Sequence, residues 1–356
     1  MDRLYCFASE GISVVDVREP KVLQPIKTES EERFQWADGL ISNDQGLIFI
    51  NERRKNQVFV VNTNTNEVAA ILSVGPNPVH IYITPDGKGV WTHSDEEGSL
   101  YPIDVASIQV IGKVNAAATG TGHGKLLMHS DLGSKGYATN AADNFVHIVD
   151  INNKKVTGKI DTIGPSHGKA YSTLSKHAYI AGQGGLSVID TQTDSFLKHI
   201  AGGGLVFGSP DGKLFLSAKR KEGELLVIDA LRDEVSNVLP SPGGTDQIFF
   251  NEKNGRMYAY TINVDASDVS IIDLNAKREV KRIPVGDRFV PPNAPPHSAD
   301  HRSGCMSDDY LFVPSSLEKK VEFIDTEKRE LSHSLDAGMA VQQTFYIGAG
   351  VHHHQH

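Results

Sequence analysis

A short β-rich phrase that ends in Asp or Asn recurs along the chain and constrains its fold more than any other feature. The eight copies end at Asp16, Asn62, Asp104, Asp150, Asp190, Asp229, Asp273 and Asp325. They span 309 residues in seven intervals. The mean period of about 44 residues is typical of four-stranded propeller blades. The repeat therefore predicts an all-β fold, an eight-bladed β-propeller.

Each unit is predicted to contain four short strands separated by turn residues. In the unit whose phrase ends at Asp104, the strands are expected at 79–83, 89–93, 99–103 and 109–114. The chain begins in mid-unit, at what would be a second strand, and residues 341–347 form a first strand with no successor. We expect these ends to pair and close the ring, which removes exposed sheet edges. Residues 1–351 then form one domain, followed by a His-rich tail at 352–356.

Composition excludes several classes of function. The chain has 35 Lys and Arg against 44 Asp and Glu, a net charge of −9, which argues against nucleic-acid or anionic-membrane partners. No apolar stretch approaches the roughly 18 to 20 residues that span a bilayer, and no signal-peptide pattern is present. We expect a monomer that is either cytosolic or already processed. No nucleotide-binding loop, nucleophile turn or metalloprotease helix occurs, so no enzyme class is indicated.

Alignment of the units places one residue of each at the start of the innermost strand. These residues are Asp38, His80, His123, His167, one near Leu205, Asp246, then His297 or Asp300, and Gln342. Three consecutive units therefore carry histidine, and equivalent residues on adjacent blades lie close enough to converge. Three or four imidazoles make an ordinary zinc site, with Asp38 or water in the fourth position. Imidazole also suits copper, so the ligands do not decide the metal.

The other histidines divide into four groups. His129 shares a strand face with His123 but lies roughly 20 Å along it, at about 3.3 Å per residue, too far for a shared ion. His297 and His301 are weaker candidates for a second site with Cys305. His352, His353, His354 and His356 form either a native metal-collecting arm or a purification tag. The remaining ones are predicted to be surface residues: His93, His147, His177, His199 and His333.

Two cysteines are too few for a disulfide framework or a cysteine-built zinc module. Cys6 falls on the second strand of the closing blade, and Cys305 just before the second strand of the preceding blade. A disulfide between adjacent blades and two free buried thiols are both consistent with these positions.

The repeats with VID phrases and PDG turns resemble bacterial YVTN-type propellers over nearly the whole chain. Gly75-Pro76-Asn77-Pro78-Val79-His80, His123-Gly124 and His167-Gly168 resemble, more narrowly, the periplasmic zinc chaperones of the AztD type. The resemblance implies zinc ligation by His80, His123 and His167. It also implies a periplasmic location and delivery of zinc to the substrate-binding protein of an ABC transporter. The sequence departs from that family in its C-terminal His-rich run and in the lack of a cysteine just before His167.

Two other functions stay open. Eight-bladed propellers also resemble the haem-binding domain of nitrite reductase, in which the three histidines would contact a modified haem. That function calls for several channel-facing arginines to bind the haem carboxylates, and the aligned positions offer none. A metal-free interaction scaffold is the third hypothesis, since a propeller by itself implies no chemistry.

Overall fold

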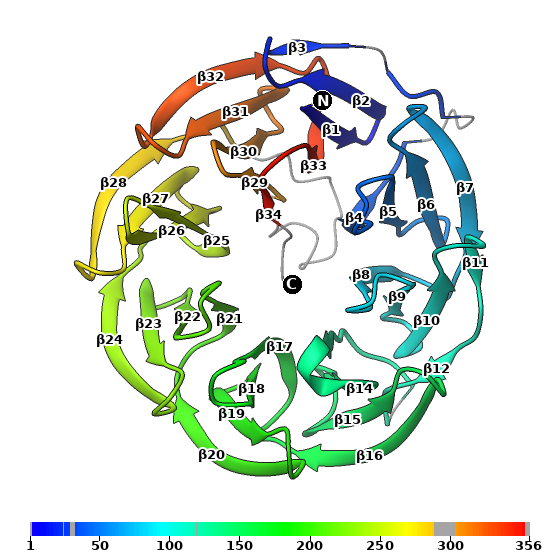
Figure 1. The fold of residues 1–356 in the computed structure, drawn as a ribbon, viewed down its shortest axis with the longest axis vertical. Helices are drawn as coiled ribbons and strands as arrows, with labels where there is room; N and C mark the ends of the chain where they lie inside the picture. Colours follow the sequence, from blue (N-terminus) through cyan, green and yellow to red (C-terminus); the bar gives the residue numbers. More distant parts are fainter. Residues whose placement is uncertain (1, 24, 29–32, 119, 288–302, 353–356) are drawn as a thin grey trace. The chain divides into compact units, whose positions relative to one another are not determined.

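The computed structural model describes the chain except residues 1, 24, 29–32, 119, 288–302 and 353–356. Its described residues form strands and a 3-10 turn, η1 (Ser130–Leu132). The strands make eight antiparallel sheets, each built around four strands (Figure 1). The chain is therefore an eight-bladed β-propeller, as its repeats predict.

The chain divides into two compact units, one of residues 1–52, 59–71 and 241–355 and the other chiefly of residues 53–58 and 72–240. Four blades lie mainly in the first unit. Their strands are β1 (Arg3–Ala8), β2 (Gly11–Asp16), β3 (Lys21–Val22), β4 (Trp36–Ile41), β5 (Leu47–Glu52), β6 (Gln57–Asn62), β7 (Glu67–Ser73), β25 (Thr245–Lys253), β26 (Arg256–Asn263), β27 (Asp268–Asp273), β28 (Arg278–Pro284), β29 (Cys305–Ser307), β30 (Tyr310–Ser315), β31 (Lys320–Asp325), β32 (Glu330–Asp336), β33 (Val341–Ile347) and β34 (Val351–His352).

The second unit holds the other four blades, which come between β7 and β25 in the sequence. Their strands are β8 (Pro78–Ile83), β9 (Gly89–Ser94), β10 (Ser99–Asp104), β11 (Gln109–Val110), β12 (Val114–Asn115), β13 (Leu126–Met128), β14 (Lys135–Ala138), β15 (Phe145–Asp150), β16 (Lys155–Asp161), β17 (Ser166–Tyr171), β18 (His177–Gly182), β19 (Gly185–Asp190), β20 (Ser195–Ala201), β21 (Leu205–Gly208), β22 (Leu214–Lys219), β23 (Glu224–Asp229) and β24 (Glu234–Pro240). The predicted strand at 109–114 is split, because β11 and β12 pair separately with β10.

The recurring Asp has a local cause. It ends the third strand of a blade, and its carboxylate accepts backbone hydrogen bonds from the following turn, as Asp190 does from Gln192 at 2.7 Å. Four residues after the Asp or Asn, in seven of the eight copies, the backbone enters the left-handed region, for example with φ of 55° at Asp194 and 54° at Asp233. This turn starts the fourth strand, so the repeat in the sequence is a repeat of turn chemistry.

A tyrosine on the second strand of several blades reaches the turn of the next blade. Tyr5 donates its hydroxyl to Asn66 at 2.6 Å, and Tyr179 donates to Asp233 and to the carbonyl of Ala230. Apolar side chains fill the space beside these contacts, as in the cluster that joins Tyr179 and Leu186 to Phe215. Hydrogen bonds and apolar packing thus act together between neighbouring blades.

The chain ends meet within the first unit as predicted. β33 pairs antiparallel with β1, with Leu4 opposite Tyr346 and Tyr5 opposite Phe345. The resulting sheet has the order β3-β2-β1-β33. The predicted domain boundary at residue 351 falls inside β34, where the backbone of His352 pairs with that of Met306.

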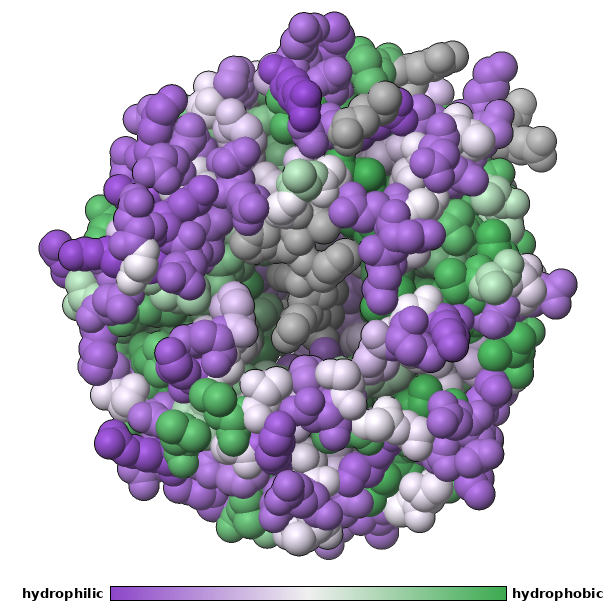
Figure 2. Space-filling model, viewed as in Figure 1, coloured by the Kyte–Doolittle hydropathy of each residue, from purple (hydrophilic) through white to green (hydrophobic). Residues whose placement is uncertain are grey.

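No helix among the described residues is long and apolar enough to cross a membrane. On the face drawn in Figure 2, apolar side chains lie in separate groups among hydrophilic ones. The large apolar side chains that are fully buried include Trp91, Phe215 and Phe312 on second strands of their blades. The apolar residues of the strands therefore serve mainly to pack the blades.

Candidate metal centre

Five of the aligned residues of the sequence occupy equivalent places in the structure. In five blades the first strand carries a β-bulge, a position that re-aims a side chain. The register shifts that mark these bulges enclose Asp38, His80, His167, Asp246 and Gln342. His123 lies just before β13, where its carbonyl accepts a hydrogen bond from the backbone of Ala141 at 2.7 Å. The alignment of first strands is thereby supported by backbone geometry.

Three histidines of the second unit converge. The Nε2 of His80 lies 3.0 Å from that of His123 and 3.4 Å from that of His167. His80 and His123 are buried, with exposures of 2% and 8%, and His167 is partly buried. One nitrogen of each ring lies within 4.8 Å of the others. Residues that are 43 and 87 positions apart are thus gathered around one point.

The spacing of these nitrogens fits a tetrahedral metal ion. Zn–N bonds of about 2.0 to 2.1 Å place two ligand nitrogens about 3.3 Å apart, close to the 3.0 and 3.4 Å of this cluster. In a neutral imidazole whose proton lies on Nδ1, the Nε2 atom carries a lone pair. A cation at the centre interacts favourably with all three lone pairs, so the residues present fit a divalent metal.

His123 also contacts a carboxylate on the preceding blade. Its Nδ1 lies 2.6 Å from Oδ2 of Asp95, and the Oδ1 of Asp95 lies 3.0 Å from the Nδ1 of His93. Burial by itself would raise the pKa of the Asp95 carboxyl. The hydrogen bonds from His123 and His93 outweigh burial and hold that pKa well below its usual range.

The glycines around His123 are required by the blades themselves. A Cβ on Gly124 would lie 2.2 Å from the carbonyl oxygen of Thr139 and 2.8 Å from the Nε2 of His93. Gly122 has a φ of 126°, and a Cβ there would lie 2.1 Å from the Oδ1 of Asn140. Their contacts let the His123 segment pack against its neighbours.

Asp95 was not predicted from the sequence, and His93 was predicted in the wrong place. His93 was predicted to be a surface residue, which is wrong, since its side chain is fully buried in β9. The burial of His93 could have been predicted from its strand, Gly89–Ser94. The apolar and polar residues of this strand do not alternate, as expected for a strand covered on both faces. Asp95 follows that strand directly and carries no motif of its own.

The other predicted ligands stay predictions. Asp38 is 9% exposed in β4 of the first unit, and its ligation of the metal stays a prediction. The backbone of His352 lies in β34. His297, His301, His353, His354 and His356 lie outside the described residues.

His129 is separate from the three clustered histidines, as predicted, and it caps the 3-10 turn by accepting a hydrogen bond from the backbone of Asp131. The thiols of Cys6 and Cys305 are free. Burial is the main cause that raises the pKa of each thiol.

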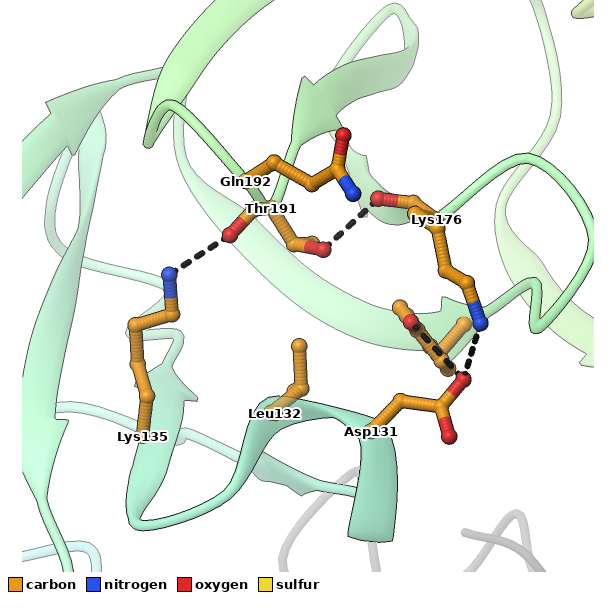
Figure 3. Close-up of a pocket in the computed structure, with 7 residues that line it drawn as sticks. Asp131, Leu132, Lys135, Lys176, Thr191 and Gln192 are labelled. Atoms are coloured by element: carbon orange, nitrogen blue, oxygen red, sulfur yellow. Dashed lines mark hydrogen bonds and ion pairs between the residues drawn. The ribbon is translucent and has the colours of Figure 1, made fainter.

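A pocket of about 370 Å³ lies elsewhere in the second unit. Lys176 pairs with Asp131 at 2.6 Å, and Lys135 donates to the carbonyl of Thr191, as Figure 3 shows. The three clustered imidazoles and Asp95 are not among the residues that line this pocket. The pocket is therefore separate from the histidine cluster.

Comparison with solved structures supports the fold. Two structures of AztD from Citrobacter koseri align with a TM-score of 0.72 at 15% identity, covering 97% of both chains in the apo structure and 99% of both in the other. The dihydro-haem d1 dehydrogenase NirN aligns with a TM-score of 0.73 at 13% identity, covering 96% of this chain and 74% of that one. No family model and no curated protein matches the sequence. At such identities the similarity establishes the propeller fold alone.

Proposed function

We propose that this propeller binds a divalent transition-metal ion, zinc foremost, through the Nε2 atoms of His80, His123 and His167. The observation that carries the proposal is the convergence of these three nitrogens, two pairs of which lie 3.0 and 3.4 Å apart. Neutral imidazoles are good zinc ligands, and three protein ligands are typical of a site that keeps a fourth position for exchange. Asp38, a water molecule or a group from a partner would fill that position.

We further propose that the metal is cargo and that the protein is a zinc chaperone. The resemblance to the AztD type supports delivery to the substrate-binding protein of a zinc ABC transporter in the periplasm. A site with an exchangeable position transfers metal by stepwise replacement of its ligands. No acid, base or nucleophile needs to act on a substrate in this mechanism, which is consistent with the lack of a catalytic motif.

A haem-binding propeller is the alternative, and the fold of NirN is equally similar. Protein ligands bind haem iron at axial positions, on opposite faces of the macrocycle. Three imidazole nitrogens gathered around one point suit a small ion better than a macrocycle. Copper remains the alternative ion, because imidazole suits Cu(II) and the general affinity order favours it.

Elemental analysis and chelator competition test the proposal. The tail histidines are first replaced by Ser at positions 352, 353, 354 and 356, so that only the propeller is measured. We expect one zinc per chain, and loss of that zinc in the triple variant His80→Ala, His123→Ala, His167→Ala. The double variant His199→Ala, His333→Ala is the control, since both side chains are exposed on outer strands.

An unchanged zinc stoichiometry in the triple variant would contradict the site. Parallel titrations with zinc and copper decide the preferred ion, and an absorption spectrum of the protein as isolated detects a bound haem directly.

A further inference from the structure

A carboxylate bridges two buried histidines beside the metal centre. Asp95 follows β9, and each of its oxygens contacts a different imidazole: Oδ2 the Nδ1 of His123 at 2.6 Å, and Oδ1 the Nδ1 of His93 at 3.0 Å. The side chain of Asp95 is 12% exposed, that of His123 is 8% exposed and that of His93 is fully buried. The three side chains therefore form a network that is largely shielded from water.

The chemistry of a carboxylate determines which ring nitrogens carry protons. An ionised carboxylate only accepts hydrogen bonds, so the Nδ1 atoms of both His123 and His93 must donate. In a neutral imidazole the other nitrogen then has a lone pair. For His123 that lone pair lies on Nε2, the atom that is 3.0 Å from the Nε2 of His80.

We propose that Asp95 is a positioning residue that holds His123 in the tautomer and ring orientation needed for metal binding, and that buried His93 holds Asp95 in place. The inference rests on the proposed metal site and names a group that acts on it from outside the ligand set. A carboxylate behind a ligating histidine fixes its tautomer and raises the basicity of the ligand nitrogen. Asp95 would act in this way although it does not touch the ion.

The packing around His93 supports its part in the network. Its Nε2 is buried and has no hydrogen-bond partner among the described residues, so its polar contact is made through Nδ1 alone. Gly124 lies against this ring, because a Cβ at position 124 would come within 2.8 Å of the Nε2. The segment that carries His123 thus packs on His93, and one displaced ring would shift the other.

The second unit also contains a matched control. His177 contacts the carboxylate of Asp233 through its Nδ1 at 3.0 Å, and this pair is not part of the metal cluster. A substitution of Asp233 therefore removes the same type of contact from a histidine that does not face the ion.

The test compares Asp95→Asn with Asp233→Asn in the chain whose tail histidines are replaced. Zinc affinity is measured by chelator competition, and folding by thermal unfolding of the metal-free protein. We expect Asp95→Asn to weaken zinc binding roughly 10- to 100-fold while one zinc still binds at saturation. Asp233→Asn should leave the affinity within about twofold of the parent. Equal affinity in Asp95→Asn and the parent, with both proteins folded, would overturn the inference.

A second measurement reads the tautomer directly in the metal-free parent protein. Nitrogen-15 NMR of the histidine rings, assigned with His123→Ala, should show the proton of His123 on Nδ1. A proton on Nε2 instead would overturn the inference even if Asp95→Asn failed to fold. The outcomes also separate the two proposals: a parent that binds no zinc but shows this tautomer contradicts the metal site and leaves the positioning intact.

Discussion

Two histidine–carboxylate pairs of the second unit share the same chemistry and differ in their surroundings. In one, the Nδ1 of His123 contacts Asp95 at 2.6 Å; in the other, the Nδ1 of His177 contacts Asp233 at 3.0 Å. Beyond Asp95 the network continues to a second histidine. Beyond Asp233 it continues to the hydroxyl of Tyr179, on the second strand of the preceding blade. We propose that the first pair supports a metal site, whereas the second fastens one blade to the next.

The difference lies in what the far side of each imidazole faces. The Nε2 of His123 faces the imidazole of His80 at 3.0 Å, with that of His167 close by. His177 stands at the first position of β18 and is not one of the three clustered histidines. A histidine–carboxylate pair is therefore no sign of a metal centre until a second ligand faces it.

The largest expected effect is a difference in zinc affinity between variants of the two histidine–carboxylate pairs. His123→Ala removes a ligand and should lower zinc affinity by more than the roughly 100-fold that marks the loss of a supporting group. His177→Ala should leave the affinity within about twofold, because its ring is outside the cluster. Chelator competition on both variants measures the difference. A comparable loss in the two variants would show that zinc binds elsewhere.

The next effect separates the two pairs by stability. Asp233→Ala leaves the hydroxyl of Tyr179 and the ring of His177 without their shared acceptor. Loss of such buried contacts should lower the free energy of unfolding by about 1 to 3 kcal/mol. Urea unfolding measures this, and zinc affinity should stay unchanged. Tyr179→Phe is the control, because it removes the contacts of the hydroxyl with Asp233 and Ala230 while the carboxylate of Asp233 still contacts His177.

A third prediction concerns the backbone beside the first pair. Gly124→Ala places a methyl group against the carbonyl of Thr139 and the ring of His93. We expect a loss of about 1 to 3 kcal/mol in stability, as for overpacking in a well-packed core, together with weaker zinc binding. Gly158→Ala on the outer strand β16 is the control, since its closest contact is the flexible end of Ile148 at 3.2 Å. Equal zinc affinity in the two variants would argue against close packing of the His123 segment.

The smallest effect is expected at a histidine with no carboxylate partner. Neither ring nitrogen of His147 has a hydrogen-bond partner among the described residues, and both are buried. His147→Phe should therefore keep stability within about 1 kcal/mol or raise it, because a buried polar group without a partner is costly. His93→Phe, which removes the contact to Asp95, should destabilise the protein more. Urea unfolding of both variants ranks them.

His147→Phe should also change how the stability of the protein depends on pH. Burial lowers the pKa of His147 below its ordinary value. The unfolded chain then binds the proton more readily, so stability is lost as the pH falls through the unfolded value of about 6.5. His147→Phe should reduce this acid-dependent loss between about pH 7 and pH 5. An unchanged pH profile of unfolding would show that His147 does not titrate differently in the folded state.

Much of the architecture follows from local sequence. The Asp that ends a third strand caps a four-residue turn, so its recurrence counts the blades without knowledge of any distant contact. The strands expected at 89–93 and 99–103 differ from Gly89–Ser94 and Ser99–Asp104 by one residue each. The strand expected at 109–114 was less accurate, because it is interrupted between β11 and β12.

The sequence by itself determined the number of blades, the closure of β33 on β1 and the repeat position shared by His80, His123 and His167. These follow from periodicity, which is a property of short segments. Only the tertiary structure decided that three Nε2 atoms meet and that Asp95, 28 residues before His123, stands behind it. Such contacts depend on bulges, side-chain rotamers and the packing of one blade on the next. No spacing along a single strand encodes them.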